Sequence, residues 1–167
     1  MILMLTSCGV IFLSGLLALG YGRSNRASSF LAVAGVCTGC VIALKPVVSA
    51  LRGPALDPIH LTWSVPWGAF SISLDGLSAF FCLPILILSP LAAIYGFAYL
   101  AHEKKPLGVH WFFYNTLIAS MLLLLMARNG MLFLMAWEVM ALSSFFLVVF
   151  DDEHEHVRQA GWTYLIA

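Results

Sequence analysis

The sequence predicts an all-α integral membrane protein with about five transmembrane helices, a truncated sixth helix and a small extracytoplasmic β-hairpin. Of its 167 residues, 62% are hydrophobic and only 10% are charged, and the mean hydropathy is +0.97. A soluble domain of this size needs a polar surface that such a chain cannot supply. The eight basic and eight acidic residues balance, so the composition also excludes the basic surface of a nucleic-acid-binding protein.

Apolar runs place the membrane-spanning helices. About 20 apolar residues are needed to cross about 30 Å of hydrocarbon. Five runs meet this length, at residues 1–21, 27–50, 77–101, 109–127 and 131–150. A sixth run begins near Ala160 and has eight residues, which at about 1.5 Å each cannot cross a bilayer. We therefore expect the sequence to be an N-terminal fragment of a longer protein.

Basic residues predict the orientation. No charged residue precedes Tyr21, whereas Arg23 and Arg26 follow the first apolar run, the reverse of a cleaved signal peptide. With the N-terminus outside, the inner loops hold five basic residues and the outer side holds three. The prediction is a multi-pass protein of the plasma (inner) membrane, surrounded by lipid, with an extracytoplasmic N-terminus.

The chain divides into four segments. The first two spans occupy 1–50, an extracytoplasmic loop 51–76, spans three to five 77–150, and a cytoplasmic turn with the start of a sixth helix 151–167.

The long outer loop reads as a hairpin on the membrane surface. Three prolines and three glycines in residues 51–76 argue against a helix there. Strands are expected at 63–65 and 69–74. Trp63 and Trp67 suit the headgroup layer, where an indole ring is half-buried and its N–H stays hydrated.

Three features of the spans have structural interpretations. Asp75, just before the third span, is expected to cap that helix by accepting backbone N–H bonds. Pro84 and Pro90 each remove a backbone donor and are expected to kink it. Lys45 lies close enough to the outer end of the second span to extend its ammonium into the interface.

Two clusters raise the question of a metal site. Cys37 and Cys40 share a helix face in CTGC, but no further ligands follow at metal-binding spacing, so they are interpreted as small packing residues. DDEHEH, at 151–156, lies at the inner interface and lacks a second ligand set. Within it, Glu153, His154 and His156 are candidates for proton uptake because imidazoles and carboxylates titrate around working pH. No metal site is expected.

Glu138 is the one carboxylate in the fifth span, MLFLMAWEVMALSSFFLVVF. It lies about eight residues from the outer turn and about twelve from the inner one, too far to reach water by extending its side chain. A charge at a helix centre costs on the order of 2.5–3.5 kcal/mol. A protonated, hydrogen-bonded structural role is one interpretation. Proton or ion handling with a cation on another helix is favoured, because ionisable groups in membranes are mostly functional.

Three segments resemble the antiporter-like proton-translocating membrane subunits of the complex I superfamily. They are SLDGLSAFF at 73–81, the stretch 112–150 with its Trp-Glu pair, and VRQAGWTYLIA at 157–167. WEVMALSSFFLVV followed by an acid-rich turn is most similar to the large membrane subunit of hydrogenase-4 and formate hydrogenlyase. Sodium/proton antiporter subunits are close behind, and the respiratory NADH dehydrogenase subunit is more distant.

The resemblance implies a function. It makes Glu138 the proton-pathway acid, paired in the family with a lysine on a later helix, and it places Phe145 where a tyrosine is common. It implies no cofactor in this chain and a non-catalytic role in an oxidoreductase complex of hydrogenase or NADH dehydrogenase type. The implied partners are other membrane-arm subunits and a peripheral redox module, as in a membrane-bound [NiFe] hydrogenase.

Three alternatives stay open at the level of sequence. The chain could belong to a cation/proton antiporter complex, to an antiporter-like subunit of NADH-quinone oxidoreductase, or be a remnant without transport activity. Neighbouring genes separate a hydrogenase from a cation/proton antiporter, and a stop codon or frameshift in the DNA downstream of the YLIA codons identifies a remnant.

Overall fold

The computed structural model describes residues 1–21, 24–53, 56–62, 68–103, 105–151 and 155–166. Within this part, five helices are long and apolar enough to cross a membrane, which confirms the predicted fold class. They are α1 (Ile2–Gly20), α2 (Asn25–Arg52), α3 (Gly76–Tyr99), α4 (Gly108–Met126) and α5 (Gly130–Val148). A 3-10 turn, η1 (Leu100–His102), extends α3, and a shorter helix, α6 (Glu155–Ile166), follows α5.

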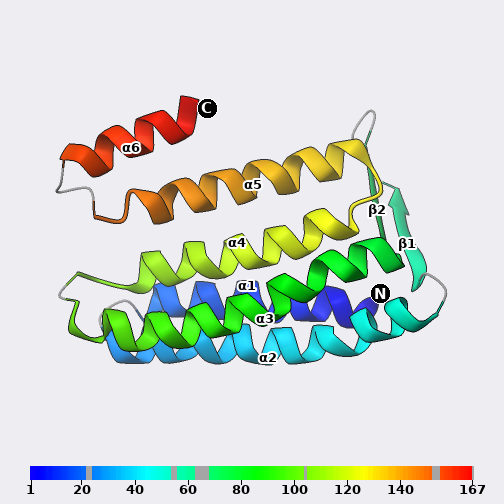
Figure 1. The fold of residues 1–167 in the computed structure, drawn as a ribbon, viewed down its shortest axis with the longest axis horizontal. Helices are drawn as coiled ribbons and strands as arrows, with labels where there is room; N and C mark the ends of the chain where they lie inside the picture. Colours follow the sequence, from blue (N-terminus) through cyan, green and yellow to red (C-terminus); the bar gives the residue numbers. More distant parts are fainter. Residues whose placement is uncertain (22–23, 54–55, 63–67, 104, 152–154, 167) are drawn as a thin grey trace.

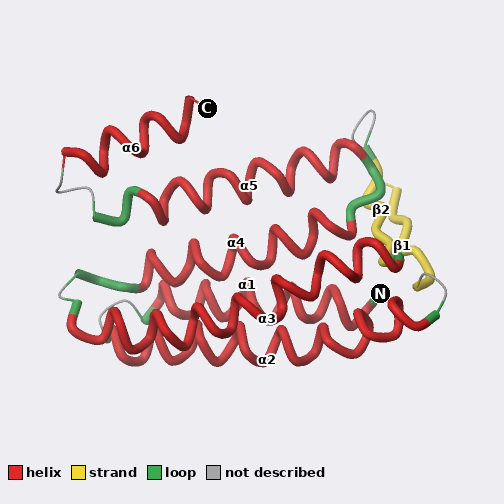
Figure 2. The backbone as a smooth tube through the Cα atoms, viewed as in Figure 1, coloured by secondary structure: helices red, strands yellow, loops and turns green. Residues whose placement is uncertain are grey.

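The five long helices run along one common axis (Figure 1). Helix α1 packs against both α2 and α4, α3 packs against α2, and α5 packs against α4. Helix α6 turns back beside α5, with which it makes its contacts. All strand structure in the described part of the chain gathers at one end of the helices (Figure 2), which is called the hairpin end below. Because α5 is at the edge of this arrangement, one of its sides is left free of the other long helices.

The hairpin differs in one strand from the prediction. Strand β2 (Ala69–Leu74) lies where it was expected, but it pairs antiparallel with β1 (Leu56–Thr62). Residues 63–67, which include the predicted first strand and both tryptophans, lie outside the described residues. Pro58 falls within β1, at a shift of register between Leu56 and Ile59. A bulge in a two-stranded sheet tolerates a proline, which has no N–H to donate to the ladder.

Asn115 connects three helices at the centre of the protein. Its side chain is fully buried, and its Nδ2 lies 2.9 Å from Ser14 Oγ, 3.2 Å from the Ile11 carbonyl and 3.3 Å from the Ala32 carbonyl. Those acceptors belong to α1 and α2, whereas Asn115 belongs to α4. Water cannot satisfy polar groups at this depth, so one amide fixes how the three helices face each other.

Glycines allow α1 to approach its neighbours closely. A Cβ on Gly35 would overlap Ser14, and one on Gly39 would overlap Ile11. At Gly15, a Cβ would lie only 2.9 Å from the Asn115 Cβ. Small residues at helix interfaces let backbones pack tightly in lipid, where packing replaces the hydrophobic effect as the driving force.

Prolines do not end the helices that contain them. Helix α2 continues through Pro46 to Arg52, and α3 is one helix from Gly76 to Tyr99 with Pro84 and Pro90 inside it. The lost backbone bonds are tolerated in membrane helices because neighbouring groups satisfy the freed carbonyls. The kinks expected at Pro84 and Pro90 stay a prediction.

Gly35→Ala should lower the free energy of unfolding by about 1–3 kcal/mol, the usual cost of overpacking a tight interface. Gly9→Ala, on the same pair of packed helices, is the matched control, because no atom lies within 4 Å of its added Cβ. That control should be neutral or stabilising, since alanine is the better helix former. Denaturant unfolding in mixed micelles measures both; equal stabilities would contradict the close α1–α2 packing.

Candidate functional site

The start of α5 is fixed by its cap. Asn129 Oδ1 accepts hydrogen bonds from the backbone N–H groups of Met131 at 2.9 Å and Leu132 at 3.4 Å. An asparagine at this position satisfies donors that otherwise lack a partner at a helix N-terminus. With the helix begun at Gly130, Glu138 lies near the middle of its 19 residues.

The turn that carries this cap is bound to the hairpin. Arg128 donates its backbone N–H to the Ser71 carbonyl at 2.8 Å, and Ala127 forms a bridge to Ile72 of β2. The Arg128 guanidinium lies 2.7 Å from Asp75 Oδ2 and 3.4 Å from Ser78 Oγ. Backbone and side chain together therefore hold the beginning of α5 against β2 and the beginning of α3.

Asp75 has two roles in this arrangement. Its Oδ1 accepts the Ser78 backbone N–H at 2.8 Å, which is the N-cap geometry of α3, while its Oδ2 faces Arg128. The bond from the Ser78 N–H, followed by the Ser78 side chain and Arg128, holds the pKa of Asp75 below its usual value of 3.8. The sequence predicts the cap. It does not predict the ion pair, because Asp75 and Arg128 lie more than fifty residues apart and form no local pattern.

Glu138 points away from the rest of the helices. The buried residues of α5 are Leu132, Ala136 and Ser143. At about 100° per residue, Glu138 lies roughly 140–160° around the helix from Ala136 and Ser143. Its side chain is exposed, and among the described residues nothing forms a hydrogen bond or ion pair with its carboxylate. The cation that we expect to pair with Glu138 therefore does not come from the described part of this chain.

Helix α6 covers the C-terminal part of the same face. Phe145 lies seven residues after Glu138 and so shares its side of α5. Gly161 of α6 packs there, since a Cβ on it would overlap Val149 and lie 3.5 Å from the Phe145 ring. Tyr164 and Ser144 form a hydroxyl–hydroxyl hydrogen bond one turn further along α6. Figure 1 shows α6 turning back and running beside the C-terminal part of α5.

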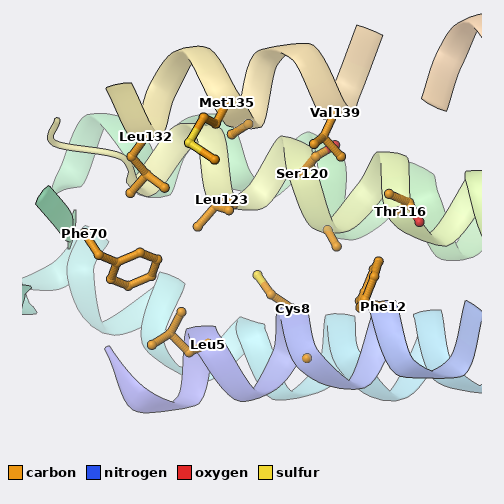
Figure 3. Close-up of a pocket in the computed structure, with 13 residues that line it drawn as sticks. Leu5, Cys8, Phe12, Phe70, Thr116, Ser120, Leu123, Leu132, Met135 and Val139 are labelled. Atoms are coloured by element: carbon orange, nitrogen blue, oxygen red, sulfur yellow. The ribbon is translucent and has the colours of Figure 1, made fainter. Parts of the chain in front are cut away.

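An apolar groove of about 490 Å³ lies on another side of α5. Figure 3 shows Met135 and Val139 of α5 facing Cys8 and Phe12 of α1 across it, with Phe70 at one end. The two hydroxyls that line the groove donate their protons to backbone carbonyls of α4. Thr116 donates to the Phe112 carbonyl and Ser120 to the Leu117 carbonyl. The residues that line it do not include Glu138, so this groove offers the carboxylate no polar route. The list of lining residues is Leu5, Cys8, Gly9, Phe12, Phe70, Thr116, Ala119, Ser120, Leu123, Leu132, Met135, Ala136 and Val139.

One of the predicted proton-uptake residues, His156, lies at the end of the helices opposite the hairpin. His156 lies exposed in the first turn of α6, whereas Glu153 and His154 fall outside the described residues. Nearby, Lys105 and Asp151 form an ion pair at 2.7 Å that ties the end of α5 to the loop before α4. In the described part of the chain, no three histidine, cysteine, aspartate or glutamate side chains gather as metal ligands would.

A second set of bonds shapes this end. Asn25 donates its side-chain amide to the carbonyls of Glu103 at 3.2 Å and Lys105 at 3.0 Å, and accepts the Leu107 N–H at 3.1 Å. One side chain at the start of α2 thus orders the loop that carries Lys105. No local sequence pattern predicts this contact, because Asn25 and Lys105 lie 80 residues apart in the chain.

Comparison with known proteins places part of this chain among membrane subunits. No protein-family model matches it. It is 36% identical over 95 residues to hydrogenase-4 component B of Escherichia coli (strain K12), which takes in 56% of this chain and 14% of that protein. It is 28% identical over 120 residues to the antiporter subunit mnhA2 of Staphylococcus aureus, covering 66% of this chain and 15% of that protein. The chain thus spans a small part of the length of these relatives.

A solved structure has the same fold. In the membrane-bound sulfane sulfur reductase, an archaeal respiratory membrane complex, one chain superposes with a TM-score of 0.62 and 21% identity. The match covers 83% of this chain and 22% of that one.

Asp75→Ala removes both the α3 cap and the Arg128 ion pair, whereas Asp75→Asn keeps a capping oxygen and removes only the charge. Amide hydrogen exchange should therefore speed up about fivefold at Ser78 in Asp75→Ala alone, and at Met131 in both variants. Because the folded pKa of Asp75 is lowered, its contribution is present above the usual value of 3.8 and is lost as pH falls through the lower folded value. Identical exchange in the two variants would contradict the double role.

Proposed function

We propose that this chain, which over part of its length is homologous to hydrogenase-4 component B and to Mnh antiporter subunits, belongs to the proton-translocating machinery of a complex I-like membrane assembly. The assembly we propose is an oxidoreductase of the membrane-bound [NiFe] hydrogenase type, the hydrogenase-4 or formate hydrogenlyase kind. The alignment with hydrogenase-4 component B supports this choice. The single observation that carries the function is the position of Glu138.

The position of Glu138 supports a role in proton transfer. It lies near the middle of a membrane-spanning helix, on the side that faces away from α4, and forms no bond with the described residues. A carboxylate there is costly unless a cation compensates it. A lysine brought close stabilises the ionised acid, and its withdrawal favours the protonated acid. Proton release and uptake at Glu138 then follow the position of the partner, which we assign to a later helix.

Protons would reach this face from the inner end of α5. We assign uptake to Glu153, His154 and His156, whose side-chain types exchange protons around neutral pH. His156 is exposed at the start of α6. The same helix then runs along the side of α5 that carries Phe145 and, further on, Glu138. A path along the α5–α6 contact would lead from His156 past Phe145 in the direction of Glu138.

The remaining assignments follow from this role. The electron-transfer chemistry belongs to partner subunits, so we assign no cofactor to this chain. Its partners are other membrane-arm subunits and a peripheral redox module, in keeping with relatives named as a component and as a subunit of larger assemblies. The protein is multi-pass. We propose the plasma membrane as its location and an extracytoplasmic hairpin end, because basic residues favour the opposite end.

Glu138→Gln in the full-length, assembled complex should abolish redox-driven proton translocation while leaving electron transfer in partner subunits detectable. The amide keeps the size and hydrogen-bonding capacity of the side chain but cannot exchange a proton. Acidification of proteoliposomes, followed with a pH-sensitive dye, measures the effect. Glu103→Gln is the matched control, because that exposed loop glutamate lies outside the long helices. Normal translocation by assembled Glu138→Gln complexes would end the proposal.

Replacing Glu153, His154 and His156 together, by glutamine and two alanines, should slow translocation without abolishing it. Water and buffer can still deliver protons at a lower rate, so added imidazole should restore part of the loss. His102→Ala controls for removal of an exposed histidine at the same end of the helices. An unchanged maximal rate in the triple variant would remove these residues from the pathway.

A cation/proton antiporter is the second candidate, and the alignment with mnhA2 over 66% of this chain favours it. It would use the same acid. The two functions differ in their driving force, since an antiporter moves protons in response to an imposed sodium gradient without any redox reaction. Proteoliposomes given only a sodium gradient separate the two.

A further inference from the structure

A second groove lies at the hairpin end, remote from the inner-end uptake residues. It has a volume of about 480 Å³ and is bounded by the beginning of α1, the last part of α2 and strand β1. These three elements meet at one end of the molecule (Figure 1). The side chains that matter are Lys45, Ser49 and Asp57 as polar groups, and Ile2, Pro46 and Ile59 as apolar ones.

Two opposite side-chain charges line this groove without pairing with each other, and Met1 with its terminal ammonium lies beside them. The Lys45 ammonium and the Asp57 carboxylate are both exposed and both line it. In the part of the chain that the structure describes, neither forms an ion pair or hydrogen bond. The Ser49 hydroxyl lies one helical turn beyond Lys45, on the same side of α2. A cation, an anion and a hydroxyl are therefore available to one ligand.

The groove lies at the depth of lipid headgroups. Lys45 is seven residues from the end of α2 at Arg52, about 10 Å along the axis, and α1 begins at Ile2. The apolar side chains of Ile2, Pro46 and Ile59 line the same groove. A ligand that fits has charges of both signs and an apolar chain.

We propose that this groove binds a phospholipid whose headgroup carries a primary ammonium, as phosphatidylethanolamine does. Lys45 and Ser49 hold the phosphate, and Asp57 accepts hydrogen bonds from the ammonium. The quaternary ammonium of phosphatidylcholine has no N–H to donate to Asp57. An anionic lipid such as phosphatidylglycerol satisfies Lys45 but leaves Asp57 without a cation. The pair of charges thus selects the headgroup, and the apolar side chains hold the acyl chain.

Native mass spectrometry of the full-length protein tests this directly. The protein is equilibrated in detergent with equal amounts of phosphatidylethanolamine, phosphatidylcholine and phosphatidylglycerol, and the retained lipids are counted. The wild type should retain phosphatidylethanolamine most. Lys45→Gln should lower retention of all three lipids about fivefold, the effect of one basic residue near a lipid phosphate.

Substitutions at Lys45 and Asp57 test the roles of the two charges separately. Asp57→Asn should keep phosphate binding but lose the preference for phosphatidylethanolamine over phosphatidylglycerol. Lys45→Arg should retain the wild-type pattern, since it keeps the positive charge. Arg52→Gln is the matched control, because this cation ends the same helix without lining the groove, and it should change nothing.

Three results would overturn the proposal. Wild-type protein could retain the three lipids equally, Arg52→Gln could lose lipid as much as Lys45→Gln does, or soluble glycerophosphoethanolamine could displace the lipid at equal concentration. The last result would identify a headgroup site for a soluble ligand, to which the apolar side chains contribute nothing.

Discussion

Hydrocarbon offers a polar group no hydrogen-bonding partner, and most of this structure follows from that constraint. The Asn115 side-chain amide donates to acceptors on two other helices, α1 and α2. The buried Trp111 donates its indole N–H to Ser29 on α2 at 2.7 Å. Serine hydroxyls inside the helices bond to backbone carbonyls, as Ser7 does with Gly39 at 2.7 Å. The bonds of Asn115, Trp111 and Ser7 each satisfy a group at membrane depth and also join one helix to another.

Glu138 is an exception to this constraint, because its carboxylate forms no hydrogen bond or ion pair with the described residues. This exception makes it the candidate for function. Several polar side chains of the other long helices bond within the protein, while this carboxylate is directed to the one side of α5 that the other long helices leave free. The docking of Arg128 on Asp75 and of Ala127 on β2 sets where α5 begins and therefore how deep Glu138 lies. The contacts of Arg128 and Ala127 at the hairpin end therefore position the Glu138 carboxylate in the middle of the membrane.

Sequence alone predicted what depends on composition and on local pattern. Hydropathy located all five long helices, and the isolated acid at 138 stood out against an apolar run. It did not show which side of α5 carries that acid, because apolar residues surround the helix and leave no polar stripe to read. Sequence also did not predict β1, because a proline such as Pro58 is rare within strands. Nor did it predict the contacts of Asn25 and Arg128, which join segments far apart in the chain.

The central claim is that a proton binds to and leaves Glu138. Infrared difference spectroscopy of the full-length assembled complex, recorded during turnover, detects the C=O stretch of a protonated carboxylic acid. If Glu138 is that acid, a carboxylic acid band changes during turnover and is missing from Glu138→Gln. A band that persists unchanged in that variant would show that the acid that exchanges the proton lies elsewhere.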